Sequence, residues 1–189
     1  VKKFGLPDIF INCSYPRTKD WAKNSFKNIK ILSLKKNIEN QLTSSSFLLR
    51  EVAETNKNKN KKCSIVMLGS IYGLVGQDRN IYKGTSVSEN LSYSIVKGGI
   101  INLTKQMGSY YSRHGIRINN VCPGGVYDRS ISKKDKKYNR LVKNYSKRSP
   151  MNRMANPDEI ADPIIFLASD NSSYISGSSL VVDGGWTSI

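Results

Sequence analysis

The sequence predicts an α/β fold in which a parallel β-sheet carries helices on both faces. Apolar runs of strand length lie at residues 8–12 and 63–69, and a third, at 116–122, ends at a Pro-Gly turn. Longer stretches with helical spacing of apolar residues separate the runs, and such alternation is typical of parallel sheets. With 189 residues and 38% hydrophobic content, the chain is expected to form a single domain over residues 1–189.

The remaining elements follow from local patterns. A helix is expected from Asn37 to about Thr55, because the apolar residues between them follow helical spacing. Asn156 and Pro157 are typical of a helix N-terminus. The basic segment 126–149 is weakly patterned and is expected to be a mobile lid or a loop. The other expected elements are a helix from 92 to about 112 and a last strand within 177–183.

The net charge of +16 raises the possibility of a nucleic-acid partner. The lysines concentrate in residues 56–62 and 133–147, which are polar and loop-like, and the first of these alternates lysine with asparagine. Such segments are typical of solvated loops. The sequence therefore predicts a small-molecule substrate and no nucleic-acid partner.

Composition also argues against membrane and metal classes. No apolar run reaches the roughly 18 residues that a membrane span needs, and the first eight residues lack a secretion signal, so a cytoplasmic protein is expected. The three cysteines are widely spaced and the chain has one histidine. This pattern predicts reduced thiols and no metal site.

Tyr93 and Lys97 are the first candidate catalytic residues. Four positions separate them, so a helix would place the phenol and the amine on one face. A phenol has a pKa near about 10 and exchanges protons poorly at neutral pH unless a nearby cation favours its ionised form. Lys97 could be that cation, or it could simply solvate a helix face.

Other candidates come from strand ends. Ser70 follows the run at 63–69, Asn12 ends the run at 8–12, and Pro123 and Gly124 follow the third run. Because the carboxyl ends of parallel strands meet at one edge of a sheet, these residues are expected to converge with Tyr93. A serine hydroxyl there can bind a carbonyl oxygen while Tyr93 transfers the proton.

These motifs resemble those of the short-chain dehydrogenase/reductase family. The similar segments are Gly-Ser-Ile-Tyr-Gly around Ser70, Tyr-Ser-Ile-Val-Lys at 93–97, Ile-Arg-Ile-Asn-Asn-Val-Cys-Pro-Gly at 116–124 and the late Val-Asp-Gly-Gly. The resemblance implies a Rossmann-like fold, NAD or NADP as cofactor, and interconversion of an alcohol and a carbonyl. It implies a homodimer or homotetramer formed by the helices that carry Asn37 and Tyr93.

The resemblance also implies roles for individual residues. Ser70, Tyr93 and Lys97 would be the catalytic triad, and Asn37 would hold a proton-relay water. Tyr93 and Lys97 would also contact the cofactor, together with Asn12 near the adenosine and Pro123, Gly124 and Val126 in the turn.

The chain departs from the family pattern at several points. Cys13-Ser14-Tyr15 replaces the Asn-Ala-Gly that usually follows the first asparagine, and Asp128 stands where a threonine usually touches the nicotinamide amide. An insertion around residues 78–90 lengthens the segment between Ser70 and Tyr93. These features are similar to a branch linked to bacterial sugar and flagellin-glycan modification, which implies a sugar-derived substrate.

No glycine-rich turn of the kind that binds a cofactor diphosphate precedes Asp8 in the sequence. The expected sheet therefore lacks the first strands and that turn, either because the chain is a fragment or because the gene starts late. The alternative function is a non-catalytic or truncated family member that acts as a subunit or interaction partner.

Overall fold

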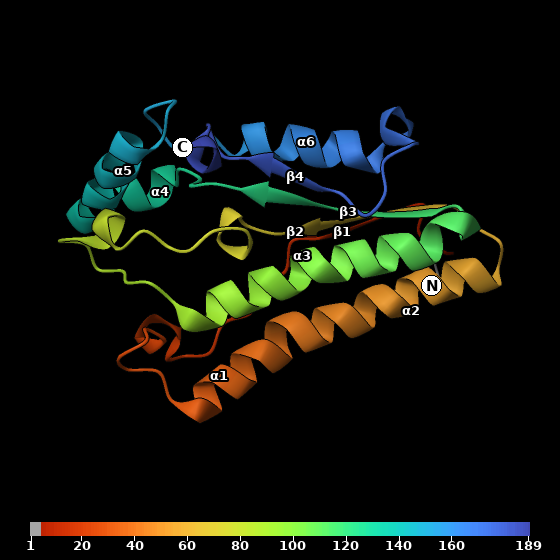
Figure 1. Ribbon diagram of the computed structural model, residues 1–189, viewed down its shortest axis with the longest axis horizontal. Helices are drawn as coiled ribbons and strands as arrows, with labels where there is room; N and C mark the ends of the chain where they lie inside the picture. The colour runs from red at the N-terminus through yellow and green to blue at the C-terminus, as the bar shows by residue number, and fades with distance from the viewer. Residues whose placement is uncertain (1–4) are drawn as a thin grey trace.

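The computed structural model describes residues 5–189 and confirms the α/β fold (Figure 1). Four parallel strands form one sheet in the order β1-β2-β3-β4. The strands are β1 (Ile9–Asn12), β2 (Cys63–Leu68), β3 (Ile116–Pro123) and β4 (Ser179–Val182). Residues 1–4, which entered the expectation about secretion, lie outside the described part.

Helices cover both faces of the sheet, as predicted. Figure 1 shows α1, α2 and α3 along one face and α6 along the other. Past the end of the sheet lie α4 and α5. The bounds are α1 (Ile31–Ile38), α2 (Ser44–Asn58), α3 (Leu91–Tyr111), α4 (Arg129–Ser132), α5 (Lys136–Arg148) and α6 (Asp158–Ala168).

The core follows from the alternation of side chains along the central strands. Ile65 and Met67 of β2 are buried on the side of α2 and α3, whereas Val66 is buried towards α6 with Val121 of β3. Because both faces of β2 are covered, this strand reads as an apolar run rather than as a half-exposed one. The polar Asn119 of β3 is buried too, and its amide bonds to the backbone at Ile175 and Ser178.

The helix expected to begin at Asn37 begins six residues earlier. It runs through α1, a π-helical turn at Glu39–Thr43, and α2. The prediction was wrong at this end because the Asn37 side chain does not cap a helix; its amide donates to the Ser33 carbonyl one turn back. Near the other helix start, α6 begins at Asp158 and no side chain caps it by a hydrogen bond; instead, the Glu159 carboxylate accepts from the Asn156 N–H.

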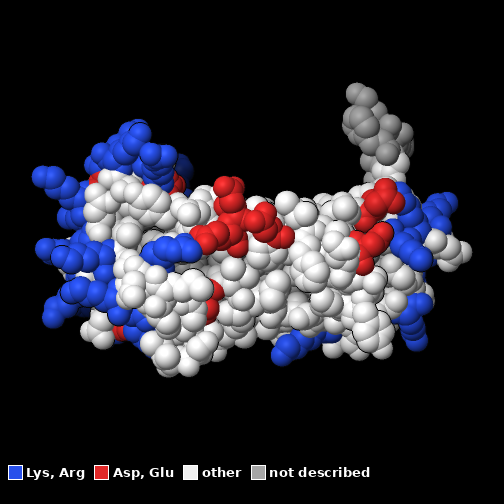
Figure 2. All heavy atoms as spheres, turned by 90° about the horizontal axis from the view of Figure 1, so that it is seen from above, with Lys and Arg blue, Asp and Glu red and all other residues white. Residues whose placement is uncertain are grey.

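Segment 126–149 is neither a loop nor a lid without structure. It forms α4 and α5, each capped by an aspartate, Asp128 and Asp135. The apolar side of α5 packs Tyr145 against Trp186, with ring centroids 4.4 Å apart. Figure 2 shows Lys and Arg side chains gathered at this end of the molecule. The sequence pattern was therefore too weak to predict α5, because most of its residues are polar or basic and its apolar face is narrow.

None of the helices in residues 5–189 is long and apolar enough to cross a membrane.

Candidate functional site

Ser70 lies just beyond the carboxyl end of β2. Its Oγ accepts a hydrogen bond from the Tyr72 backbone N–H at 3.2 Å, which starts a short 3₁₀ turn at Ile71–Gly73. Gly69 before it has no room for a side chain, since a Cβ there would lie 2.7 Å from Asn120 Oδ1. The strand end and the turn therefore fix the serine in a buried position.

The α3 helix positions Tyr93 and Lys97. The Asn90 side chain caps it by accepting from the Tyr93 N–H at 3.0 Å. Lys97, one turn later, is buried and donates from Nζ to the Leu68 carbonyl at 2.7 Å. Its Nζ lies 5.5 Å from the centroid of the Tyr93 ring. The pair therefore shares a helix face that points at the end of β2, as the spacing predicted.

Gly73 sets how closely the serine turn approaches α3. A Cβ at Gly73 would lie 2.6 Å from the Lys97 backbone and 2.6 Å from Ile101 Cδ1. Real Cβ atoms do not come so close, so only glycine allows the turn to contact the helix at this point. The separation of Ser70 from Tyr93 and Lys97 depends on this contact.

A cavity of about 180 Å³ lies where these elements meet. It brings together six residues that the sequence predicted, namely Ser70, Tyr93, Lys97, Pro123, Gly124 and Val126. The loop after β1 contributes Cys13, Ser14 and Tyr15 to the same wall. The convergence at the carboxyl edge of the sheet is therefore present in the structure.

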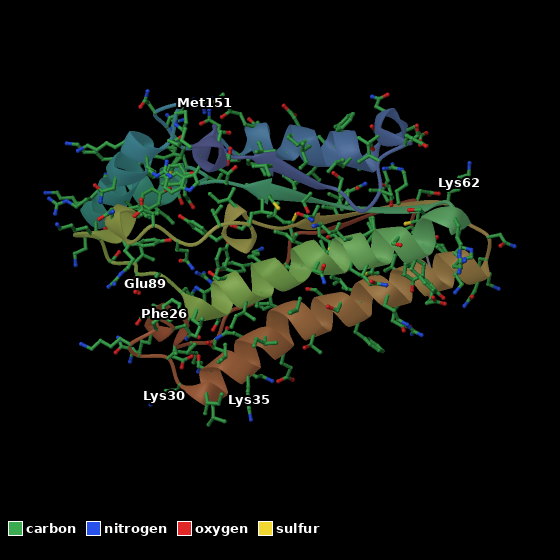
Figure 3. The ribbon with its side chains drawn as sticks, viewed as in Figure 1. Phe26, Lys30, Lys35, Lys62, Glu89 and Met151 are labelled. Atoms are coloured by element: carbon green, nitrogen blue, oxygen red, sulfur yellow. The ribbon has the colours of Figure 1, made fainter. Side chains whose placement is uncertain are left out.

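Two larger cavities lack such a cluster. Phe26 and Glu89, which lie near each other in Figure 3, line a cavity of about 810 Å³ with Ser94. Lys62 lies at the opposite end of the molecule and lines a cavity of about 760 Å³. Arg117 in that cavity is already bonded to the carbonyls of Leu167 and Ser169 and to a serine hydroxyl. Volume alone does not identify the functional site.

The electrostatics of the pair differ from the sequence-based expectation. Burial raises the pKa of Tyr93, and the hydrogen bond with Ser70 offsets this rise only in part. Burial lowers the pKa of Lys97 to about 8. The phenol is therefore protonated at neutral pH, and Lys97 does not hold it as phenolate before a reaction begins. In this state Tyr93 is suited to donate a proton.

Aromatic rings surround Tyr93, a feature that the sequence analysis did not recognise. Tyr15, Trp21 and Tyr93 make mutual edge-to-face contacts, with centroid distances of 5.5, 5.8 and 6.2 Å. Tyr72 adds a further contact with Tyr93 at 6.3 Å. The sequence signal for this feature was Tyr15, an aromatic residue three positions after the carboxyl end of β1, where parallel sheets bind ligands.

Asn37 is not brought to the cavity. It is fully buried in a network in which its Oδ1 accepts from the Thr18 N–H at 3.2 Å and its Nδ2 donates to Thr18 Oγ1 at 2.9 Å. Its Nδ2 also lies within bonding distance of Asn24 Oδ1, at 3.3 Å. These contacts hold the loop after β1 against α1. The proton-relay role expected for Asn37 has no geometric support, because its amide is already occupied.

A second buried amide on the same helix has the opposite environment. Gln41 lies in the π-helical turn and is 3% exposed, and neither of its side-chain polar atoms has a hydrogen-bond partner among the described residues. Leu42, next to it, packs where Gly99 of α3 leaves room. Buried amides normally find partners, so this one is unusual. The sequence alone does not indicate that a glutamine in a helix will be buried without hydrogen-bond partners.

The predicted cofactor contact Asn12 is used locally instead, and so is Asp128, which replaces the family's threonine. The Asn12 side chain accepts from the backbone N–H and hydroxyl of Ser14, and Asn12 is not among the residues that line the cavity. Asp128, at the position expected to touch a nicotinamide amide, caps α4 by accepting from the N–H groups of Ser130 and Ile131.

The fold and the site together define a Rossmann-like α/β protein with a cavity at the carboxyl edge of its parallel sheet. A family model described as enoyl-(acyl carrier protein) reductase matches residues 1–187. The chain therefore belongs to the short-chain dehydrogenase/reductase family, as the motifs indicated.

Several relatives resemble the chain. The 2-(S)-hydroxypropyl-CoM dehydrogenase 3 of Xanthobacter autotrophicus is 34% identical over 76% of this chain and 54% of its own length. Post-translational flagellin modification protein A of Campylobacter coli is 28% identical over 98% of this chain and 69% of its own. L-rhamnose 1-dehydrogenase of Azotobacter vinelandii is 29% identical over 98% and 66%. The chain thus spans about half to two thirds of these proteins.

A solved structure gives the same fold. The short-chain dehydrogenase of Leptospira borgpetersenii, with bound NAD⁺, superposes with a TM-score of 0.83 at 30% identity, covering 96% of this chain and 65% of that one.

Proposed function

We propose that the protein is an NAD(P)-dependent oxidoreductase that interconverts an alcohol and a carbonyl on a sugar-derived substrate. The observation that carries the proposal is the convergence of Ser70, Tyr93 and Lys97 on one cavity at the carboxyl edge of the sheet. The similarity to a dehydrogenase structure with bound NAD⁺ supports the cofactor class. The similarity to an L-rhamnose dehydrogenase supports the substrate class.

The cavity fits the nicotinamide half of such a cofactor. No acidic side chain is among the described residues that line it, and Lys97 is one of those residues. Lys97 and the turn at Pro123, Gly124 and Val126 would hold the group. A bound nicotinamide would supply the hydride donor or acceptor. The described residues include no glycine-rich turn for a diphosphate.

The chain's own groups would handle the oxygen and its proton. Ser70 Oγ accepts from the Tyr72 N–H and its proton is shared with Tyr93, so that proton could be donated to a substrate carbonyl instead. Tyr93 is protonated at neutral pH because burial raises its pKa, and it can protonate the developing alkoxide. The Lys97 ammonium, 5.5 Å from the ring, would stabilise the phenolate that remains.

Tyr93→Phe tests the proposal in the complete enzyme. Loss of a positioned acid is expected to reduce turnover by about 10²–10⁴-fold. Thermal unfolding should change little, since the ring and its edge-to-face contacts remain. Tyr110→Phe, on an exposed tyrosine of the same helix, is the matched control and should keep full activity. Turnover that survives Tyr93→Phe would refute the assigned role.

The proposal also includes self-association through the outer face of α1 and α2. Four large apolar side chains are exposed there, Ile31, Leu32, Phe47 and Leu48. Such residues rarely cluster on the surface of a monomer. Sedimentation of the chain and of a Phe47→Glu variant tests this point: the wild type should sediment as a dimer or larger and the variant as a monomer, and a monomeric wild type would overturn it.

A further inference from the structure

The described residues that line the cavity include one cation and no anion. None of the described residues that line it is acidic, while Lys97 reaches into it. Arg17 is exposed and does not line the cavity itself, but its guanidinium carbon lies 5.3 Å from the centroid of the Tyr15 ring, which does line it. Neither cation forms an ion pair with the acidic side chains of residues 5–189. Unpaired positive charge beside a cavity favours a ligand with negative charge.

Tyr15 contacts both cations and the proposed catalytic residue Tyr93. Its ring is 40% exposed, lines the cavity, and contacts the ring of Tyr93 edge-on at 5.8 Å. Lys97 Nζ lies 5.7 Å from the same centroid, so two cations flank one tyrosine. The Asn37 network holds the loop that carries Tyr15 and Arg17, because Thr18 donates to Asn37. The aromatic ring and the guanidinium therefore have a supported position.

We infer that the substrate carries an anionic oxygen group, a carboxylate or a phosphate, which Arg17 binds while Tyr15 packs against the carbon skeleton. This inference rests on the proposed function and adds the charge class of the substrate. A guanidinium presents paired N–H donors that match two oxygens of such a group. Tyr15 and Arg17 are then specificity-determining residues, and the Cys13-Ser14-Tyr15 replacement in the loop after β1 is what provides the aromatic wall.

The cofactor is a competing source of negative charge, because its phosphates could also attract Arg17. The two sources predict that different binding affinities fall when Arg17 is replaced. If Arg17 serves the substrate, Arg17→Gln weakens binding of an anionic polyol and leaves NADH affinity unchanged. If it serves the cofactor, NADH affinity falls instead, and the inference is overturned.

Trp21 provides a direct reporter, since its ring centroid lies 5.5 Å from that of Tyr15. Trp186→Phe removes the other tryptophan of the chain. The probes are three acyclic polyols that differ in charge: D-glucitol, D-gluconate and D-glucitol 6-phosphate, titrated with and without NADH. At least one charged probe is expected to bind about tenfold or more tighter than glucitol, which corresponds to about 1.4 kcal/mol. Calorimetry on the unmodified chain provides the same comparison if Trp186→Phe fails to fold.

Arg17→Gln should abolish the preference for charge, and Tyr15→Ala should weaken all three probes alike. The matched control is Arg113→Gln, which removes another arginine stacked on a tyrosine, 5.6 Å from the Tyr110 centroid. It should change no affinity. Equal affinity for glucitol and both charged probes, no saturable binding of either charged probe, or a preference that survives Arg17→Gln would overturn the inference.

The outcome is separable from that of the proposed function. Tyr93→Phe should retain the fluorescence response to the charged probe while turnover is lost. Turnover without charge preference would overturn only the substrate class. Charge preference in a chain whose turnover is insensitive to Tyr93→Phe would overturn only the catalytic assignment.

Discussion

Two clusters of buried polar groups lie close to each other and differ in how many of their donors and acceptors have partners in the protein. Around Asn37, the side chains of Thr18, Asn24 and Ser33 bond to one another, and Ser92 donates to Asn24 at 2.6 Å. Around the cavity, the Tyr93 hydroxyl and the Ser70 proton have few protein partners. A saturated cluster stabilises the fold, whereas an unsaturated one facing a cavity is available for chemistry.

The largest expected effect is on the saturated cluster. Asn37→Leu would leave the Thr18 N–H without its acceptor and would remove the amide donor to Thr18 Oγ1 and Asn24 Oδ1. At about 1–3 kcal/mol for each unsatisfied group, the free energy of unfolding should fall by up to roughly 4 kcal/mol. Turnover per folded molecule should not change. Urea denaturation measures the first quantity, with exposed Asn102→Leu on α3 as the control. Loss of turnover without loss of stability would restore a catalytic role for Asn37.

Lys97 should make stability depend on pH. Its folded pKa of about 8 lies below the ordinary 10.5, so the unfolded chain binds more protons between these values and the free energy of unfolding rises with pH from about 8 to 10. The shift corresponds to about 3 kcal/mol. Above pH 10 the raised pKa of Tyr93 opposes this rise, because the folded chain then retains more protons.

Lys97→Met should therefore remove the rise, which unfolding curves of both proteins at pH 7 and pH 10 would show. Lys105→Met, on an exposed lysine of the same helix, should keep it. Parallel pH profiles for wild type and Lys97→Met would mean that Lys97 is not buried as a cation.

Ser70→Ala should reduce kcat strongly and stability only slightly. Removing one donor to a developing oxyanion costs on the order of 10²-fold in kcat. The start of the 3₁₀ turn loses one bond, so stability should fall by no more than about 1 kcal/mol. Steady-state kinetics and thermal unfolding in parallel test this, and a comparable loss of kcat in exposed Ser86→Ala would invalidate the assignment.

The smallest effect is expected at Gln41, which does not follow the contrast between the two clusters. Gln41 is buried, yet both of its amide atoms lack partners among the described residues. Gln41→Leu should raise the free energy of unfolding by about 1 kcal/mol, because an unpaired buried amide is costly. Thermal unfolding of the variant measures it. A clear decrease in stability would show that the amide is satisfied in solution.

Sequence reasoning predicted the elements that repeat a pattern. The strands, α3 and the convergence of Ser70, Tyr93 and Lys97 followed from apolar runs and the geometry of parallel strands. It failed at α5, whose apolar face is too narrow to stand out among lysines, and at Asn37, where a residue type typical of caps bonds inside a helix. It missed Tyr15 and Arg17, although Tyr15 lies only three positions beyond the end of β1, because a strand end alone does not indicate that a following aromatic ring contacts Tyr93.

The contact at Gly73 limits how the protein could be redesigned. A single added methyl group would collide with the backbone of Lys97 and push the serine hydroxyl away from the phenol. Libraries that diversify the pocket for new substrates should therefore leave this position constant, and alanine there should impair catalysis as much as the loss of a reacting group, although glycine itself touches no ligand.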